Sequence, residues 1–464
     1  MRTEFCRSQS RYLLSMVLAC CTVGVCGSAA LAQDLAIKAG KIITVSGPTL
    51  ENGIIIIRDG RIAEVGADLE IPVDLRLLDA TDKVVMPGIV DPHSSAALNQ
   101  ANERNAVVPF LSVVDGIDPM RPYFEESRRN GVTTAVVVPG NSTMIGGQAS
   151  IVKTAGIYVD DMLLLRSAGL KLSLQPPSGS RMSHIARLRR ELETAKRQLA
   201  EAAETPPVTP EPEKPAPEKP APDQPPSSET GAVESSDSGT VQDPERTESA
   251  EGATETPADS NAAANQAVKD LLTGKTRAFI YCQNAADVGQ AFRLMDDFKF
   301  NAVLVLGQDC YKAAGEIAKR NVPVILDPTL VYWKRDPVTR LDEKIVLTKL
   351  YQDAGVKFLF QSNDSDSRQS LGSSYFWFQA ATAVRYGLSR EEAIAALTLE
   401  PAKALGIDQY VGSIQAGRDA DLVILTGDPL DVSTWVDQTL VNGKVVYERK
   451  TDWKLKLLLE AQPQ

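Results

Sequence analysis

The chain has 464 residues and a formal net charge of −11, from 49 basic and 60 acidic side chains. This acidic balance argues against a nucleic-acid-binding protein, which would carry a basic stripe, and a hydrophobic content of 43% is ordinary for a soluble globular protein. Only two histidines are present, His93 and His184, so this chain alone cannot build a site that needs three imidazole ligands.

The first 32 residues have the pattern of a secretory signal peptide. Three arginines within the first eleven residues precede an uncharged stretch at 12–33, and Ala30-Leu31-Ala32 is a small-residue cleavage signal. We therefore expect an exported protein, periplasmic or otherwise extracytoplasmic, that begins at Gln33 after cleavage. A retained membrane anchor is the alternative, because about 20 apolar residues can span a bilayer.

Residues 34–86 alternate short β-rich runs with Gly, Asn and Asp turns. Asp59-Gly60 lies between two apolar runs, which predicts a hairpin. A β pattern returns at 409–455, with the turn Asn442-Gly443. We expect these two terminal segments to form one small β-sandwich.

Between the terminal segments, short apolar runs alternate with helical stretches, which is typical of a parallel sheet. Eight such runs predict an α/β fold of the (β/α)8 TIM-barrel type, with its first part at 87–200 and its second at 265–408. The expected strands are Val84–Val90, Thr133–Val138, Ala149–Lys153, Leu170–Leu174, Arg277–Cys282, Ala302–Leu306, Pro323–Leu326 and Lys357–Phe360. The expected helices include 181–203, 286–298, 311–320, 341–353 and 389–397.

A low-complexity segment at 201–264 interrupts the predicted barrel. Residues 201–260 hold 12 of the 28 prolines and 15 acidic against 3 basic residues. Such a composition cannot bury enough apolar surface to offset its ordering entropy, so we expect a disordered insert. Since this insert carries all of the net negative charge, the remaining chain is close to neutral.

Two segments at opposite ends of the barrel region resemble the metal-dependent amidohydrolase superfamily. Val85-Met86-Pro87-Gly88-Ile89-Val90-Asp91-Pro92-His93 resembles its strand-1 motif, and Ser389–Asp428 resembles its closing signature. Gly146–Lys153 and Ala168–Lys171 are similar to the imidazolonepropionase-like branch. The resemblance implies a (β/α)8 barrel with a sandwich built from both termini. It also implies hydrolysis of non-peptide carbon–nitrogen bonds at one or two divalent metal ions.

The metal site that the resemblance implies is largely replaced. The family's strand-1 motif is His-x-His, and here it is His93-Ser94-Ser95, which puts the weak ligand Ser95 at the second position. The positions matched to the strand-5 and strand-6 histidines hold Gln283, which offers an amide oxygen, and Leu306, which offers no ligand atom. We expect His93 and Gln283 to be the remaining metal ligands, with one divalent ion such as Zn²⁺ as the cofactor if any is bound.

The catalytic aspartate at the end of strand 8 is matched by Asp364, with Asp366 as the alternative in a shifted register. The carboxylated lysine that bridges two metals in some family members has two candidates, Lys153 and Lys171. His184 is expected on a helix face, away from the ligand positions. If Gln283 faces the barrel interior, strand alternation turns Cys282 toward the helices.

The sequence therefore predicts an exported amidohydrolase-family protein with weak or no hydrolase activity, which is a pseudoenzyme. An active hydrolase with a rearranged single-metal site, a non-catalytic subunit and a small-ligand-binding module are the alternatives. The expected partners are a small-molecule substrate or ligand, with no nucleic acid, and either further copies of the chain or an intact amidohydrolase.

Overall fold

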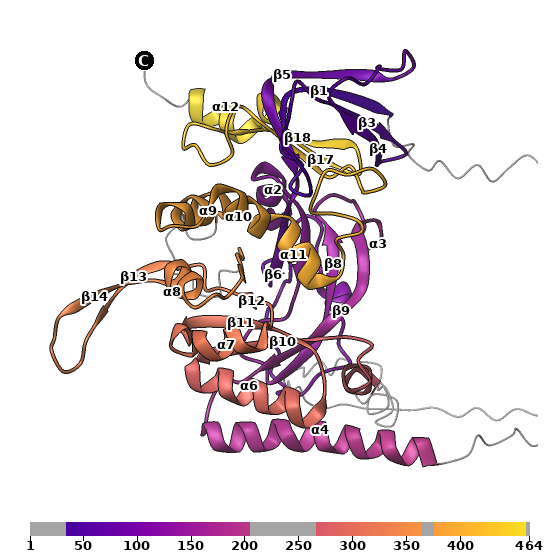
Figure 1. The fold of residues 1–464 in the computed structure, drawn as a ribbon. Helices are drawn as coiled ribbons and strands as arrows, with labels where there is room; N and C mark the ends of the chain where they lie inside the picture. Colours follow the sequence, from indigo (N-terminus) through magenta and orange to yellow (C-terminus); the bar gives the residue numbers. More distant parts are fainter. Residues whose placement is uncertain (1–33, 205–265, 363–374, 461–464) are drawn as a thin grey trace, which may run out of the picture.

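The computed structural model describes residues 34–204, 266–362 and 375–460. The expected signal peptide, nearly all of the acidic insert and both aspartate candidates, Asp364 and Asp366, lie outside the described residues. Two eight-stranded sheets organise the described chain, one at the top of Figure 1 and one through its centre.

The terminal sheet combines strands from both ends of the chain, in the order β18-β17-β16-β5-β1-β3-β4, with β2 paired to β1. The predicted hairpin at Asp59-Gly60 and the predicted turn at Asn442-Gly443 are both present, and each joins two antiparallel strands. Their turns have positive φ at both central residues (49° and 76° at Asp59-Gly60, 48° and 72° at Asn442-Gly443), which matches the right-handed twist of the flanking strands. The expected sandwich is not confirmed as two separate sheets, because hydrogen bonds join all eight strands into one sheet. Strands from the two ends of the chain share one buried core within it. The strands are β1 Leu35–Ile42, β2 Leu50–Glu51, β3 Ile54–Arg58, β4 Arg61–Gly66, β5 Arg76–Pro87, β16 Leu422–Leu425, β17 Val436–Val441 and β18 Lys444–Glu448.

The chain crosses from the terminal sheet to the central sheet at Gly88. The single strand expected at Val84–Val90 is wrong, since Pro87 ends β5 and β6 begins at Ile89. Gly88 donates its N–H to the carbonyl of Asp421 (2.9 Å), and a Cβ there would lie 2.1 Å from Thr133 Oγ1. This close approach allows only glycine at the crossing.

The central sheet has the order β15-β12-β11-β10-β9-β8-β7-β6. The expectation of an all-parallel sheet is wrong at one strand, because β8 pairs antiparallel with both β7 and β9. Among the described residues no strand pairing joins β6 to β15. The eight-stranded α/β sheet is therefore confirmed, but the closure of the predicted barrel is not. The strands are β6 Ile89–Ser94, β7 Val132–Val137, β8 Ile145–Lys153, β9 Leu163–Ser173, β10 Ala278–Asn284, β11 Ala302–Asp309, β12 Val324–Ile325 and β15 Phe358–Leu359.

Apolar side chains cover both faces of the central sheet. One buried cluster includes Val90 from β6 and Leu359 from β15, the first and last strands of the sheet. The sheet therefore curves enough for its two edge strands to share one core. A second cluster packs the other face against the helices, and it contains both Cys282 and Leu306.

Helices cover that second face, with α4 and α6 lying together at the bottom of Figure 1. The expected helix at 181–203 is α4, and it buries Leu188 and Leu192 as its apolar spacing predicts. The expected helix at 341–353 is wrong in its first half, where β14 (Asp342–Val346) pairs with β13 (Val331–Arg335). The helices are η1 Val113–Gly116, α2 Pro122–Arg129, α3 Val159–Met162, α4 Arg181–Glu204, α6 Ala285–Phe298, η2 Cys310–Ala313, α7 Ala314–Arg320, α8 Leu347–Asp353, α9 Phe376–Arg385, α10 Arg390–Leu397, α11 Leu399–Leu405, η3 Arg449–Thr451 and α12 Trp453–Glu460.

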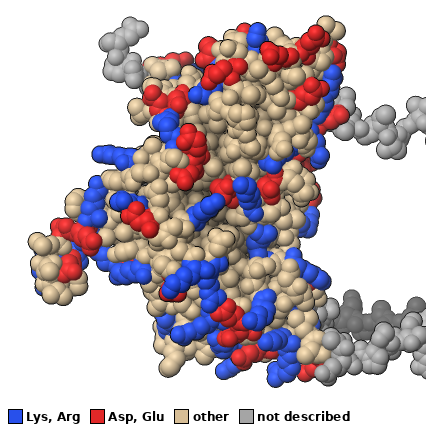
Figure 2. Space-filling model, viewed as in Figure 1, with Lys and Arg blue, Asp and Glu red and all other residues tan. Residues whose placement is uncertain are grey.

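The surface in Figure 2 carries basic and acidic side chains interspersed over both sheets. In the described part of the chain, no helix combines the length and the apolar character needed to cross a membrane.

Candidate functional site

His93 lies fully buried on β6 and is held by hydrogen bonds at both ring nitrogens. Its Nδ1 is 2.8 Å from Gln361 Oε1, at the end of β15. Gln361 Nε2 donates to the carbonyl of Leu326 (2.7 Å), so its amide oxygen must be the atom that faces His93. Nδ1 therefore carries the proton, and Nε2 presents its lone pair.

Lys171, from β9, faces that lone pair. Its Nζ is 3.0 Å from His93 Nε2 and 2.7 Å from Asn141 Oδ1, and it lies 5.7 Å from the centre of the Tyr281 ring. Burial lowers the pKa of Lys171 to about 7. Burial and the neighbouring Lys171 charge hold the pKa of His93 well below its usual value, so the imidazole is neutral at pH 7.

Asp91, two residues before His93, ties β6 to the segment that follows β15. Its Oδ1 accepts from the His93 N–H (3.2 Å) and the Ser362 N–H (3.4 Å). Its Oδ2 accepts from the Tyr123 hydroxyl (2.9 Å) and from the Ser362 hydroxyl. Burial raises the pKa of Asp91 to about 6, against the effect of these hydrogen bonds. The carboxylate thus joins the first and last strands of the sheet through side chains.

The two lysine candidates have different roles. β8 runs from Ile145, which pairs with Leu172, to Lys153, which pairs with Thr134, so the two lysines lie at opposite ends of the sheet. Lys153 Nζ lies 2.8 Å from Asp421 Oδ2 and 2.9 Å from Asp419 Oδ2, within the segment that resembles the closing signature. Only Lys171 reaches His93.

Gln283 is not among the described hydrogen-bond partners of the His93 ring, and Leu306 faces the helices. Ser95 is buried just after β6, whereas Gln283 is exposed at the end of β10, and no hydrogen bond joins it to His93 within the described ranges. Leu306 and Cys282 share the helix-facing cluster, so the interior neighbours on those strands are Val305 and Tyr281.

His184 and the cysteines are structural. His184 lies on α4, and its Nε2 donates to the carbonyl of Ser173 at the end of β9 (2.9 Å). The helix-facing direction of Cys282 agrees with strand alternation. Cys282 and Cys310 are both buried free thiols. Burial raises the pKa of both thiols, so neither is a thiolate nucleophile at neutral pH.

Three residues of the site were missed by the sequence reasoning. Gln361 and Asn141 hold the His93–Lys171 pair, and Asp327, just after β12, is a carboxylic acid whose pKa burial raises. A signal existed for Gln361 and Asp327, because each is the first or second polar residue after a short apolar strand, where barrel enzymes place their functional groups. Asn141 lies in a loop without such a signal.

Comparisons with known proteins agree with this architecture. Residues 336–446 match the sequence model of the Amidohydrolase family. Amidohydrolase tasK of Hapsidospora irregularis is 25% identical over 427 residues, which are 85% of this chain and 40% of that protein. An imidazolonepropionase of Thermoplasma volcanium is 29% identical over 125 residues, 25% of this chain and 30% of that protein. The crystal structure of an amidohydrolase from Thermotoga maritima superposes with a TM-score of 0.69 at 24% identity, covering 89% of this chain and all of that one.

The chain is therefore similar to amidohydrolases, and its match to the Amidohydrolase family model covers residues 336–446. The chain spans 40% of the length of tasK and 30% of that imidazolonepropionase. Members of this family usually bind a metal ion, so the donor atoms around His93 decide whether this chain is built to do the same.

The residues present do not fit a zinc ion. In residues 34–204, 266–362 and 375–460, no group of three or more His, Cys, Asp or Glu side chains is placed to hold a metal. Zinc sites use three or four such ligands, whereas the described neighbours of the His93 ring are an amide and an amine. The amine also occupies the one free lone pair. No chemical step is therefore assigned to a metal here.

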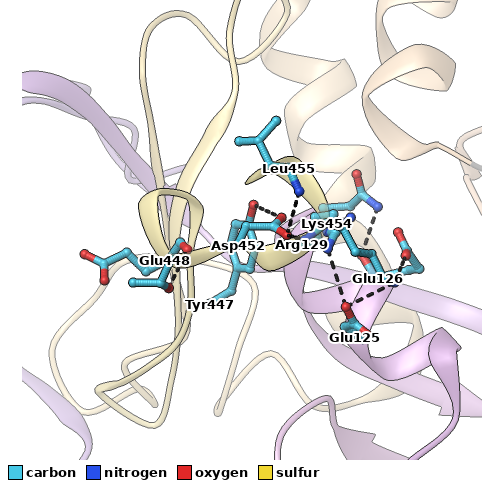
Figure 3. Close-up of polar contacts among 10 residues, drawn as sticks. Glu125, Glu126, Arg129, Tyr447, Glu448, Asp452, Lys454 and Leu455 are labelled. Atoms are coloured by element: carbon cyan, nitrogen blue, oxygen red, sulfur yellow. Dashed lines mark hydrogen bonds and ion pairs between the residues drawn. The ribbon is translucent and has the colours of Figure 1, made fainter. Parts of the chain in front are cut away.

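A separate cavity of about 660 Å³ lies between α2, α9, the end of the terminal sheet and α12. Trp377, Phe378 and Trp435 line it together with Arg129. Figure 3 shows Arg129 between Asp452 and Glu125, with the Tyr447 hydroxyl also donating to Asp452. These contacts join α2 to the C-terminal segment. The cavity adjoins the Asn130 end of α2, next to the start of β7, whereas His93 lies near the far end of β6.

Proposed function

We propose that this chain is an exported amidohydrolase-family protein that has kept the fold of a hydrolase of non-peptide carbon–nitrogen bonds with weak or no hydrolase activity. The observation that carries this proposal is the donor set at His93. Nδ1 is committed to Gln361, and Nε2 faces Lys171 at 3.0 Å. The described chain places no group of three or more His, Cys, Asp or Glu side chains to hold a metal. Without a metal to activate water, the strongest source of rate enhancement in such a site is missing.

Hydrolysis assays test the proposal. The purified mature protein is incubated with a panel of amides, cyclic amides and imidazolones, with and without added Zn²⁺ or Mn²⁺, beside an intact amidohydrolase as the positive control. We expect turnover at least about 1,000-fold below that control under all conditions, since a lost activated water is worth several kcal/mol. Metal-dependent turnover that disappears in His93→Ala would show instead an active, rearranged single-metal site and would overturn the proposal.

Export is supported by the basic, apolar and small-residue pattern of the first 32 residues. The test is the N-terminal sequence of the protein recovered from the periplasmic fraction of an expressing bacterium. We expect it to start at Gln33. Recovery of the uncleaved chain in the membrane fraction would favour the anchor instead.

A non-catalytic subunit is the role that we propose for such a protein. The support is the match to tasK, where a segment similar to nearly all of this chain is one part of a protein more than twice as long. Co-purification from the native organism tests this role. An intact amidohydrolase recovered in equal amounts would support it, and recovery of the chain alone or only with copies of itself would contradict it.

A further inference from the structure

Lys171 lies where the first metal of an amidohydrolase-type site would be coordinated by His93. The direction of the free lone pair of His93 is fixed, because Gln361 binds Nδ1 and itself is held by the Leu326 carbonyl. Lys171 Nζ lies 3.0 Å from Nε2, the only ring nitrogen left for a metal. A zinc ion placed about 2.1 Å from Nε2 along the line to Lys171 Nζ would lie only about 1 Å from that nitrogen. The two cannot be present together.

The amino group of Lys171 has hydrogen-bond partners in its observed position. It has two hydrogen-bond acceptors, His93 Nε2 at 3.0 Å and Asn141 Oδ1 at 2.7 Å. An uncharged amine has two hydrogens to donate, so both bonds persist whether or not the group carries a third proton. The Tyr281 ring adds a favourable face for the charged form, with its centre 5.7 Å away.

The packing holds Lys171 in this position. Its side chain is fully buried on β9, between paired strands β8 and β10. A Cβ built on Gly146 would lie 3.2 Å from Lys171 Cβ, so a glycine on β8 makes room for the lysine stem. The stem therefore has little freedom to withdraw and leave the His93 lone pair to a metal.

We propose that Lys171 is a built-in substitute for the metal ion, and that its amino nitrogen links β6, β9 and the Asn141 loop as a shared metal would link its ligands. The inference rests on the proposed function in treating His93 as a former metal ligand. It goes further in naming the residue that occupies the metal position. It makes Lys171 a positioning residue, with no role in covalent chemistry.

Nitrogen NMR of the imidazoles tests this arrangement directly, because the chain has two histidines with opposite tautomers. His93 is protonated on Nδ1, and His184 is protonated on Nε2, which donates to the Ser173 carbonyl. A His184→Gln variant assigns the two sets of signals. In Lys171→Met, we expect the Nε2 signal of His93 to move toward that of an acceptor without a hydrogen bond, while the His184 signals stay in place. A Lys403→Met variant, changed at an exposed side chain of α11, should leave both sets of signals unchanged.

A second measurement on the unmodified protein keeps the test decisive if Lys171→Met does not fold. We expect no change in either histidine spectrum after addition of Zn²⁺ or of a chelator, and no carbamate carbon signal after incubation with ¹³C-bicarbonate. A His93 Nε2 signal that shifts with Zn²⁺, a carbamate on Lys171, or a His93 spectrum unaffected by Lys171→Met would each overturn the inference. Metal-independent hydrolysis with the expected spectra would overturn the proposed function and leave the inference intact.

Discussion

The buried ion pairs of Lys153 offer the sharpest test of how the two sheets are joined. Lys153 comes from the central sheet, whereas Asp419 and Asp421 come from the segment that leads into β16 of the terminal sheet. Side-chain exposure is 5% for Lys153, 2% for Asp421 and 11% for Asp419. Replacing Lys153 by methionine keeps the length of the side chain and leaves the buried Asp421 carboxylate without its cation. The half-buried Asp419 carboxylate keeps only the exposed Arg61 as an ion-pair partner, at 3.7 Å.

Breaking such a buried pair costs about 3–5 kcal/mol, because the remaining charge is uncompensated. Asp421 keeps two other donors, the Thr134 hydroxyl (3.3 Å) and the Asn442 N–H (2.9 Å), which places the expected loss at about 3 kcal/mol. This corresponds to a roughly 150-fold smaller ratio of folded to unfolded protein.

Urea unfolding of Lys153→Met measures the loss. The matched control is Lys403→Met, which removes an exposed pair with Glu400 and should change the unfolding free energy by less than about 1 kcal/mol. Adding Asp419→Asn to Lys153→Met should recover part of the stability, because it removes one of the two neighbouring carboxylates that lost the Lys153 charge. A Lys153→Met protein within about 1 kcal/mol of the unmodified chain would refute the reasoning.

Three further changes have defined outcomes. Arg129→Leu leaves the buried Asp452 without its ion pair at 2.9 Å, so hydrogen exchange should show faster exchange in the C-terminal segment, and unchanged protection there would contradict the contacts in Figure 3. Asp91→Asn replaces a carboxylate that accepts four hydrogen bonds, including one from the Tyr123 hydroxyl. It should lower the unfolding free energy by about 3 kcal/mol, and an unchanged unfolding free energy would contradict this expectation. Burial raises the pKa of Asp327 above 3.8. The stability of the unmodified chain relative to Asp327→Asn should therefore fall as the pH rises from about 4 through the raised pKa. Paired pH titrations in which this relative stability increases over the same range would contradict the burial of Asp327.

Local patterns were sufficient to predict much of the fold. The hairpin at Asp59-Gly60 and the turn at Asn442-Gly443 were predicted correctly, because type I′ turns require two residues that tolerate positive φ, and few dipeptides do. The helix at α4 followed from a 3.6-residue apolar period that the structure buries. Strand prediction failed where one apolar run of the sequence is shared between two sheets. Val84–Val90 is continuous in the sequence, but Gly88 splits it between two sheets, and this division depends on packing against Thr133.

The candidate site was predictable only in part, since its key contacts join residues far apart in the chain. Strand alternation correctly placed Cys282 toward the helices. Whether Lys153 or Lys171 lies beside His93 could be decided only from the direction of β8. Because β8 is antiparallel to its neighbours, its last residue, Lys153, lies at the end of the sheet opposite to Lys171. Gln361 fixes the His93 tautomer from 268 residues away, and no short-range pattern contains that information.

Metal content is the most direct measure of the account as a whole. The purified mature protein, prepared without chelators, is analysed for zinc, manganese and iron beside its Lys171→Met variant and an intact amidohydrolase. We expect less than about a tenth of an equivalent of tightly bound metal, since one imidazole cannot hold such an ion. About one equivalent of metal, lost on His93→Ala, would contradict both the assignment of Lys171 to the metal position and the proposed loss of metal-dependent hydrolysis.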